Sequence, residues 1–261
     1  MHPTFLHIGG FELASYGLMT ALGYAAASFY LLPRAKKINI DADTFWNLIF
    51  IIFAGALIGA KLMFIVLHWG DMGATFSDRF INVFKNFRYG FVFFGGVILA
   101  ISGVMWYIRR KKLPMLKTMD FMIVGLPLGH ALGRIGCFLA GCCYGKPTTM
   151  PWGVTFTDPH SLVPDHLLGV ALHPTQLYES ALNLLLFIFL HFSYKKPHKD
   201  GKILAQYLVF YGLMRFSIEF FRGDFRGGFF LGMSPSQLIS LGTCLAALLI
   251  WLKFLRTSKN G

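Results

Sequence analysis

An arginine inside an apolar stretch is the residue of this sequence that points most directly to chemistry. Arg134 lies in an apolar run that begins near residue 121, and residues 141–148 after it form a loop with two glycines and a proline. An ionisable side chain in such a run is costly to bury and therefore indicates a functional site. His130 precedes Arg134 by four residues and shares its face on a helix. A guanidinium binds phosphate oxygens in pairs, which suggests an anionic ligand such as a phospholipid headgroup.

The alternative for Arg134 is a snorkelling side chain that only anchors the end of a helix. Gly133 and Gly136 lie on either side of it and would let another helix approach closely. This favours a packed site over a lipid-facing anchor.

A second set of polar residues lies near the end of another apolar run. Their spacings of four, four and three would place all of them on one helical face; they are Tyr211, Arg215, Glu219 and Arg222. Arg215 and Arg222 can each pair with Glu219, which lowers the cost of burial. A purely structural ladder of ion pairs explains the pattern too. Two arginines against one glutamate nevertheless leave one positive charge for an anionic ligand.

Two further motifs are weak in isolation. One lies at the start of an apolar run and contains His173, Gln176 and Glu179, with Pro174 after the histidine. A helix that begins at a proline also explains this pattern. Tyr16 lies near one end of the first apolar run, where a tyrosine of an interfacial aromatic belt is expected.

Three of the four cysteines are clustered at Cys137, Cys142 and Cys143, and Cys244 stands alone. The spacing lacks the paired Cys-x2-Cys or added histidines of common zinc sites, so we predict no metal site. A disulfide or a reactive thiol is possible on an oxidising face. For Cys137 and Cys244 we favour a role as small packing residues.

The amino-acid composition indicates that these motifs belong to a membrane protein. Hydrophobic residues make up 55% of the 261 residues, charged ones only 14%, and the mean hydropathy is +0.57. Several uncharged runs approach the roughly 20 residues that a helix needs to cross a bilayer. The net charge of +12 comes from short clusters between these runs, so we predict no nucleic-acid partner.

The sequence predicts an all-α, polytopic membrane protein that forms a single integral membrane domain over residues 1–261. We expect seven transmembrane helices, centred on residues 13–32, 45–68, 91–108, 121–140, 177–194, 203–221 and 236–252. Lys61 falls within the second and would face the bundle interior. Residues 1–10 lack the basic start and cleavage site of a signal peptide, so we expect none to be removed.

The distribution of lysine and arginine predicts the orientation. Most of these residues lie in segments 33–44, 109–117, 195–202 and after residue 252, and fewer lie in 70–90, 141–176 and 222–235. The positive-inside rule therefore places the N-terminus outside and the C-terminus in the cytoplasm. Arg134, Gly95–Gly96, His173 and Arg222 would then share the external side, near the outer leaflet.

Taken in order, the motifs resemble those of prolipoprotein diacylglyceryl transferases. The resemblance is carried by Ser-Tyr-Gly-Leu-Met at 15–19, by Gly-Arg-Ile-Gly at 133–136 with the loop 141–148, by residues 173–179, and by residues 215–222. It implies a multi-pass enzyme of the bacterial inner membrane that transfers diacylglyceryl from phosphatidylglycerol to the thiol of a lipobox cysteine in a prolipoprotein signal peptide. Glycerol 1-phosphate leaves and a thioether forms; no metal or organic cofactor is implied.

The resemblance also implies roles for individual residues. Arg134 would bind the lipid phosphate, Arg215 would stabilise the departing phosphate, and Tyr16 would hydrogen-bond the substrate. Tyr211 and Glu219 would orient Arg215. The remaining substrate-binding residues would be Gly145, His173, Gln176, Glu179 and Arg222.

Three positions depart from the common family pattern. Phe94 stands where a histidine, a candidate general base, is common; Cys137 replaces an asparagine and Cys142 a glutamate. The base is therefore unassigned, with His130, Glu219 and water as candidates. The alternatives are a variant with another acceptor or no activity, and a non-enzymatic protein that binds or carries anions or lipids. A thiol–disulfide exchanger is disfavoured because there is no Cys-x-x-Cys.

Overall fold

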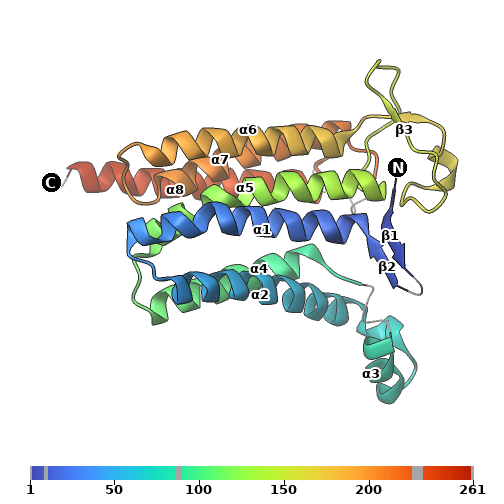
Figure 1. The fold of residues 1–261 in the computed structure, drawn as a ribbon, viewed down its shortest axis with the longest axis horizontal. Helices are drawn as coiled ribbons and strands as arrows, with labels where there is room; N and C mark the ends of the chain where they lie inside the picture. Colours follow the sequence, from blue (N-terminus) through green and yellow to red (C-terminus); the bar gives the residue numbers. More distant parts are fainter. Residues whose placement is uncertain (1, 9–10, 86–89, 225–231, 260–261) are drawn as a thin grey trace. The chain divides into compact units, whose positions relative to one another are not determined.

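The computed structural model describes residues 2–8, 11–85, 90–224 and 232–259, and they are mostly helical (Figure 1). The α-helices are α1 Ser15–Ala35, α2 Ala42–His68, α3 Phe76–Lys85, α4 Phe93–Arg110, α5 Met115–Ala140, α6 Thr175–Lys195, α7 Lys202–Ile218 and α8 Pro235–Lys259. Short 3-10 helices are η1 Lys36–Ile38, η2 Trp69–Met72, η3 Asp165–Leu167 and η4 Glu219–Phe221. Two small antiparallel sheets qualify the all-α expectation: β1 Thr4–Ile8 pairs with β2 Phe11–Ala14, and β3 Val154–Thr155 with β4 Ala171–Leu172.

A helix covers most of each of the seven runs that the sequence marked as spans. Among the described residues, four helical segments are long and apolar enough to cross a membrane: Ala42–Met72, Phe93–Arg110, Met115–Ala140 and Thr175–Lys195. Pro235–Leu249 is a shorter apolar helix. Large apolar side chains such as Phe29 and Phe50 are each 67% exposed, as expected of surfaces that face lipid. The chain is therefore a polytopic membrane protein. Helix α3, which the sequence analysis did not predict, lies between two of these spans.

The described residues form two compact units, and each is described by itself. Residues 34–118 make up one, and residues 1–33 with 119–261 make up the other. The single domain expected for residues 1–261 stays a prediction.

In the unit of residues 34–118, α2 packs closely against α4 through glycines. A Cβ built on Gly59 or Gly95 would lie 2.3 Å from the carbonyl oxygen of the other glycine, so the two backbones touch. Lys61 on α2 is buried, as expected, with its Nζ 5.4 Å from the ring centre of Phe64 and 5.3 Å from that of Phe91. Aromatic faces stabilise a buried ammonium.

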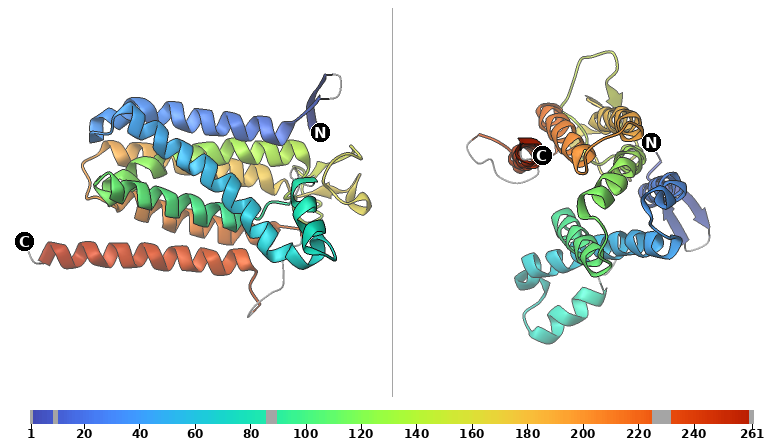
Figure 2. Two further views of the ribbon diagram at one scale, coloured as in Figure 1. Left: turned by 90° about the horizontal axis from the view of Figure 1, so that it is seen from below. Right: turned by 90° about the vertical axis from the view of Figure 1, so that its left-hand side faces the viewer.

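The other unit contains α1, α5, α6, α7 and α8, which run along a common direction in both views of Figure 2. α1 approaches α5 where a Cβ on Gly23 would lie 2.6 Å from the carbonyl oxygen of Gly129. α6 and α7 enclose a core with α5, made by Val124, Leu186, Leu190, Ile203 and Tyr207. α5 ends, α6 begins, α7 ends and α8 begins at the same end of this unit (Figure 1).

The loop between α5 and α6 folds over that end on its own small core of Tyr144, Phe156, Val163 and Leu172. Its backbone makes ladder-like hydrogen bonds on two sides. The N–H of Gly145 donates to the carbonyl of His173 at 3.0 Å, and the N–H of Lys146 donates to that of Phe221 at 2.9 Å. This loop therefore ties the start of α6 to the chain that follows α7.

Candidate active site

The carboxylate of Glu179 is the centre of the polar cluster at this end of the helices. Three arginines from different segments form ion pairs with it. Arg222 lies 3.1 Å and Arg215 3.7 Å from Oε1, and Arg134 contacts Oε2 through its Nε. The exposed fraction of the Glu179 side chain is 3%. Each of the three guanidinium groups offsets part of the free-energy cost of burying this carboxylate.

Two further acidic groups complete the charge balance. Glu219 Oε2 lies 2.6 Å from Arg215, whose Nη2 also donates to the hydroxyl of Ser236 at 2.8 Å. Asp224 accepts two hydrogen bonds of 2.8 Å from Arg222. Burial disfavours the charged form of Arg222, but the hydrogen bonds with Asp224 and the negative charges of Asp224, Glu179 and Cys143 together raise the pKa of the guanidinium.

Arg134 is held differently from the other two arginines. Its Nε donates to Nε2 of His130 at 3.1 Å, in addition to the ion pair with Glu179. The ring of His130 lies 5.6 Å from that of Tyr211, which stacks on Tyr207. Within the described residues, the two terminal nitrogens of Arg134 have no hydrogen-bond partner. The paired donors of this guanidinium are therefore available to a ligand while its stem is fixed.

A backbone frame holds these charges in place. A Cβ on Gly145 would lie 2.5 Å from His173 and 2.8 Å from the carbonyl oxygen of Phe221, so only glycine fits between the two strands. Gln176 is fully buried, and its Nε2 donates to the carbonyl of Cys142 at 2.7 Å. The side chain of His173 contacts the hydroxyl of Tyr178 at 3.2 Å.

A sequence model of the family described as prolipoprotein diacylglyceryl transferase matches residues 3–253. The chain belongs to this family. Relatives with the name phosphatidylglycerol–prolipoprotein diacylglyceryl transferase match along almost their whole length. The one from Clostridium tetani is 36% identical over 251 residues, which cover 96% of this chain and 97% of that protein. The one from Photorhabdus laumondii is 34% identical and covers 95% and 91%. One from Clostridium perfringens, whose name carries the number 2, is 33% identical and covers 94% and 92%.

Most of the residues expected to form the transferase site lie in the ion cluster or in the backbone frame around it. Five come together in the ion cluster: Arg134, Glu179, Arg215, Glu219 and Arg222. Gly145, His173 and Gln176 belong to the backbone frame, and Tyr211 supports His130. Tyr16 lies in the first turn of α1 and is 47% exposed; its backbone lies 3.2 Å from a Cβ built on Gly136, so it is next to α5. Phe94 and Gly95 lie in the other unit.

Three expectations about this site were wrong. Arg222 does not continue the helical face, because α7 ends at Ile218 and Arg222 is extended, with φ −73° and ψ 143°. Nor does the segment leave one arginine without an acid, since Asp224 and Glu179 both pair with Arg222. Gly133 was also expected to admit a neighbouring helix, but no described atom lies within 4 Å of a Cβ built there.

The sequence analysis missed Asp224 and Ser236 and gave Glu179 only a minor place. Asp224 follows Arg222 by two residues. Side chains at this spacing do not face each other on a helix, but they can meet in the extended backbone found here. Ser236 reaches Arg215 from the first turn of α8, across a chain separation of 21 residues. No local sequence pattern signals either contact.

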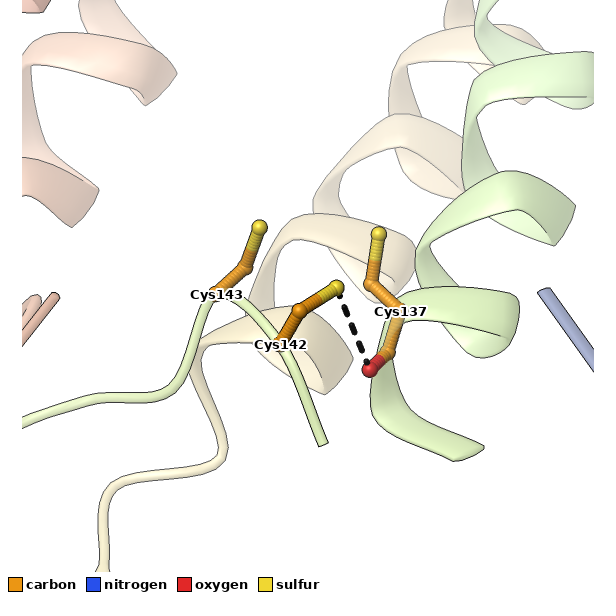
Figure 3. Close-up of side chains that lie close together, drawn as sticks. All are labelled: Cys137, Cys142 and Cys143. Atoms are coloured by element: carbon orange, nitrogen blue, oxygen red, sulfur yellow. Dashed lines mark hydrogen bonds between the residues drawn. The ribbon is translucent and has the colours of Figure 1, made fainter. Parts of the chain in front are cut away.

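The three clustered cysteines lie close together (Figure 3) and near the ion cluster, since Arg222 and Arg134 act electrostatically on Cys143. Cys137 is buried and the other two are partly buried. Hydrogen bonds from the thiols of Cys137 and Cys142, and then the charges of Arg222 and Arg134, lower the pKa of Cys143.

Proposed function

We propose that this chain transfers the diacylglyceryl group of phosphatidylglycerol to the thiol of a lipobox cysteine in a prolipoprotein signal peptide. The names of its relatives in three bacteria supply this substrate pair. The observation that carries the proposal is the guanidinium of Arg134, whose two terminal nitrogens have no partner among the described residues, beside a buried, charge-balanced cluster. A site that must bind a lipid phosphate needs such preorganised donors at membrane depth.

Arg134 binds the phosphate of phosphatidylglycerol through its two terminal nitrogens. His130 and Glu179 hold its Nε, so the fork keeps one orientation and loses little side-chain entropy when the lipid binds. The two arginines that are already paired, Arg215 and Arg222, add positive potential without competing for the same oxygens.

In the reaction, the acceptor sulfur attacks the terminal carbon of the diacylglyceryl group. The bond from that carbon to the phosphate oxygen breaks, and glycerol 1-phosphate leaves with the bonding electrons. Arg215 stabilises the charge that grows on the departing phosphate. It is held for this by Glu219 at 2.6 Å and Ser236 at 2.8 Å.

The thiol must lose its proton before or during this attack. Both side-chain candidates for the base are engaged by arginines: His130 accepts from Arg134, and Glu219 pairs with Arg215. We assign the proton to water, with the positive cluster lowering the pKa of the incoming thiol.

The remaining site residues position the others. Gly145, His173 and Gln176 fix the loop after α5 against the start of α6, which sets the distance between Arg134 and Glu179. Tyr16, exposed at the start of α1 beside α5, hydrogen-bonds the substrate.

For the membrane arrangement we propose seven transmembrane helices, α1, α2, α4, α5, α6, α7 and α8, with the N-terminus outside and the C-terminus in the cytoplasm of a bacterium. The charge bias of the loops supports this. The ion cluster then lies toward the outer leaflet of the inner membrane, where secreted prolipoproteins arrive and where membrane lipids can enter from the side.

The test is to incubate purified protein with phosphatidylglycerol and a lipobox peptide and to measure the peptide mass. Arg134→Ala and Arg215→Ala should each abolish the diacylglyceryl mass increment while the protein stays folded. Arg110→Ala, at the exposed end of α4, is the matched control and should keep full activity. Transfer by a folded Arg134→Ala/Arg215→Ala protein would refute the assignment.

A further inference from the structure

The thiols of Cys137, Cys142 and Cys143, which we call the thiol cluster, converge in space. Their sulfur atoms all lie within 4.8 Å of one another. Figure 3 shows the three side chains lying close together, one from the last turns of α5 and two from the loop that follows. None of the three is in a disulfide. The proposed transferase mechanism uses none of them.

The backbone is built to bring these sulfurs together. Neighbouring residues of an extended chain point to opposite sides, so Cys142 and Cys143 could not both face Cys137 from a regular strand. Instead, Gly141 and Cys143 have φ values of +76° and +62°. A positive φ at a residue other than glycine costs free energy and marks a constrained site.

Neighbouring segments hold this conformation. The N–H of Cys142 donates to the carbonyl of Cys137 at 3.1 Å. Two buried side chains of α6 fix the other carbonyls: Gln176 donates to Cys142 and Thr175 to Cys143, both at 2.7 Å. The cluster is therefore preorganised rather than a chance meeting of mobile side chains.

We propose that the thiol cluster binds one Cu(I) ion through three thiolates. Sulfur is the ligand that a soft monovalent ion prefers. Three sulfurs about 2.3 Å from a metal, arranged in a plane around it, lie about 4 Å apart. Small rotations of the cysteine side chains reach this spacing from the separations found here.

The number of ligands favours Cu(I) over Zn(II). Structural Zn(II) takes four protein ligands, whereas within the described residues the thiol cluster gathers only three. Binding releases one proton from each thiol, so a three-thiolate Cu(I) centre carries two negative charges. Cys143 interacts electrostatically with Arg222 and Arg134, which offset that charge.

The experiment uses the full-length, reduced protein in detergent without oxygen, with Cu(I) presented in competition with a chromogenic Cu(I) chelator. We expect one Cu(I) per chain and three sulfur ligands by X-ray absorption. Changes in groups that only support a metal ligand cost 10- to 100-fold in affinity, so loss of a ligand should cost about 100-fold or more. Each of Cys137→Ser, Cys142→Ser and Cys143→Ser should therefore weaken binding by at least that factor.

Cys244→Ser is the matched control, since Cys244 lies on α8 and its sulfur contacts the carbonyl of Val209. It should bind Cu(I) as the unchanged protein does. Thermal unfolding without copper identifies any serine variant that fails to fold. The two remaining serine variants then test whether the thiol cluster binds Cu(I). The proposal is overturned if the unchanged protein yields Cu(I) to the chelator, if Zn(II) binds and Cu(I) does not, or if Cys244→Ser loses binding equally. Because the readout is copper, failure here leaves the transferase proposal untouched.

Discussion

Replacing Glu179 by glutamine tests whether one buried carboxylate holds the three arginines together. Glutamine keeps the shape of the side chain and removes its charge. The buried Arg215 and Arg222 and the partly buried Arg134 would then have one counter-charge fewer, which is the costly way to break a buried ion pair.

The expected loss follows from the distances. At an effective dielectric constant of about 20, charges separated by 3.1 Å and 3.7 Å attract by about 5 and about 4.5 kcal/mol. Glutamine also avoids the free-energy cost of desolvating a carboxylate, and this offsets about half or more of the lost attraction. The free energy of unfolding should therefore fall by about 3–5 kcal/mol, a large part of the about 5–15 kcal/mol that typically separates folded and unfolded protein.

Denaturant unfolding in mixed micelles, followed by tryptophan fluorescence, measures this loss. Glu12→Gln is the control, because Glu12 pairs with His7 at 3.5 Å with 66% of its side chain exposed, and exposed pairs stabilise little. It should unfold as the unchanged protein does. If Glu179→Gln lost less than about 1 kcal/mol, the arginines would not depend on that carboxylate and the described cluster would be wrong.

Other consequences can be measured in the same preparations. Arg134→Lys keeps the charge but loses the fork, so transfer to the lipobox peptide should slow about 100-fold, or about 2.7 kcal/mol. Gly145→Ala should destabilise the protein by about 1–3 kcal/mol because its Cβ meets His173 and Phe221, whereas Gly133→Ala, where no described atom is near, should unfold no more easily. Serine at all three positions of the thiol cluster should leave diacylglyceryl transfer intact, as read from the mass of the peptide.

The sequence predicts the parts of the site that depend on helical spacing. Arg215 and Glu219 are four residues apart, and their side chains meet at 2.6 Å. Arg134 and His130 have the same spacing and are joined by a hydrogen bond of 3.1 Å. The seven apolar runs likewise each coincide with a helix. In all these cases the periodicity of the helix fixes which side chains are neighbours.

The parts that the sequence could not predict depend on where helices end. α7 stops at Ile218, three residues before the apolar run does, and the short η4 then turns the chain. This turn frees Arg222 from the helical register and brings it to Glu179 on α6, 43 residues away in the chain. A pattern of spacings assumes one continuous helix and so assigned Arg222 to the wrong face. The central position of Glu179 follows from this geometry alone.

The thiol cluster is a second case in which the spacing of residues in the sequence does not predict the site. The spacing of the three cysteines in the sequence argues against a metal site, because the ligand spacings of common zinc sites belong to common turns. Here Gly141 and Cys143 have positive φ values instead, and the sulfurs of the three cysteines lie within 4.8 Å of one another. What decides the ligand set is therefore the backbone conformation of two residues. That conformation is in turn held by Thr175 and Gln176, from the same α6 segment that presents Glu179 to the arginines. The first turns of α6 thus position both the charge cluster and the thiols, so a change that shifts this helix start should disturb the two together.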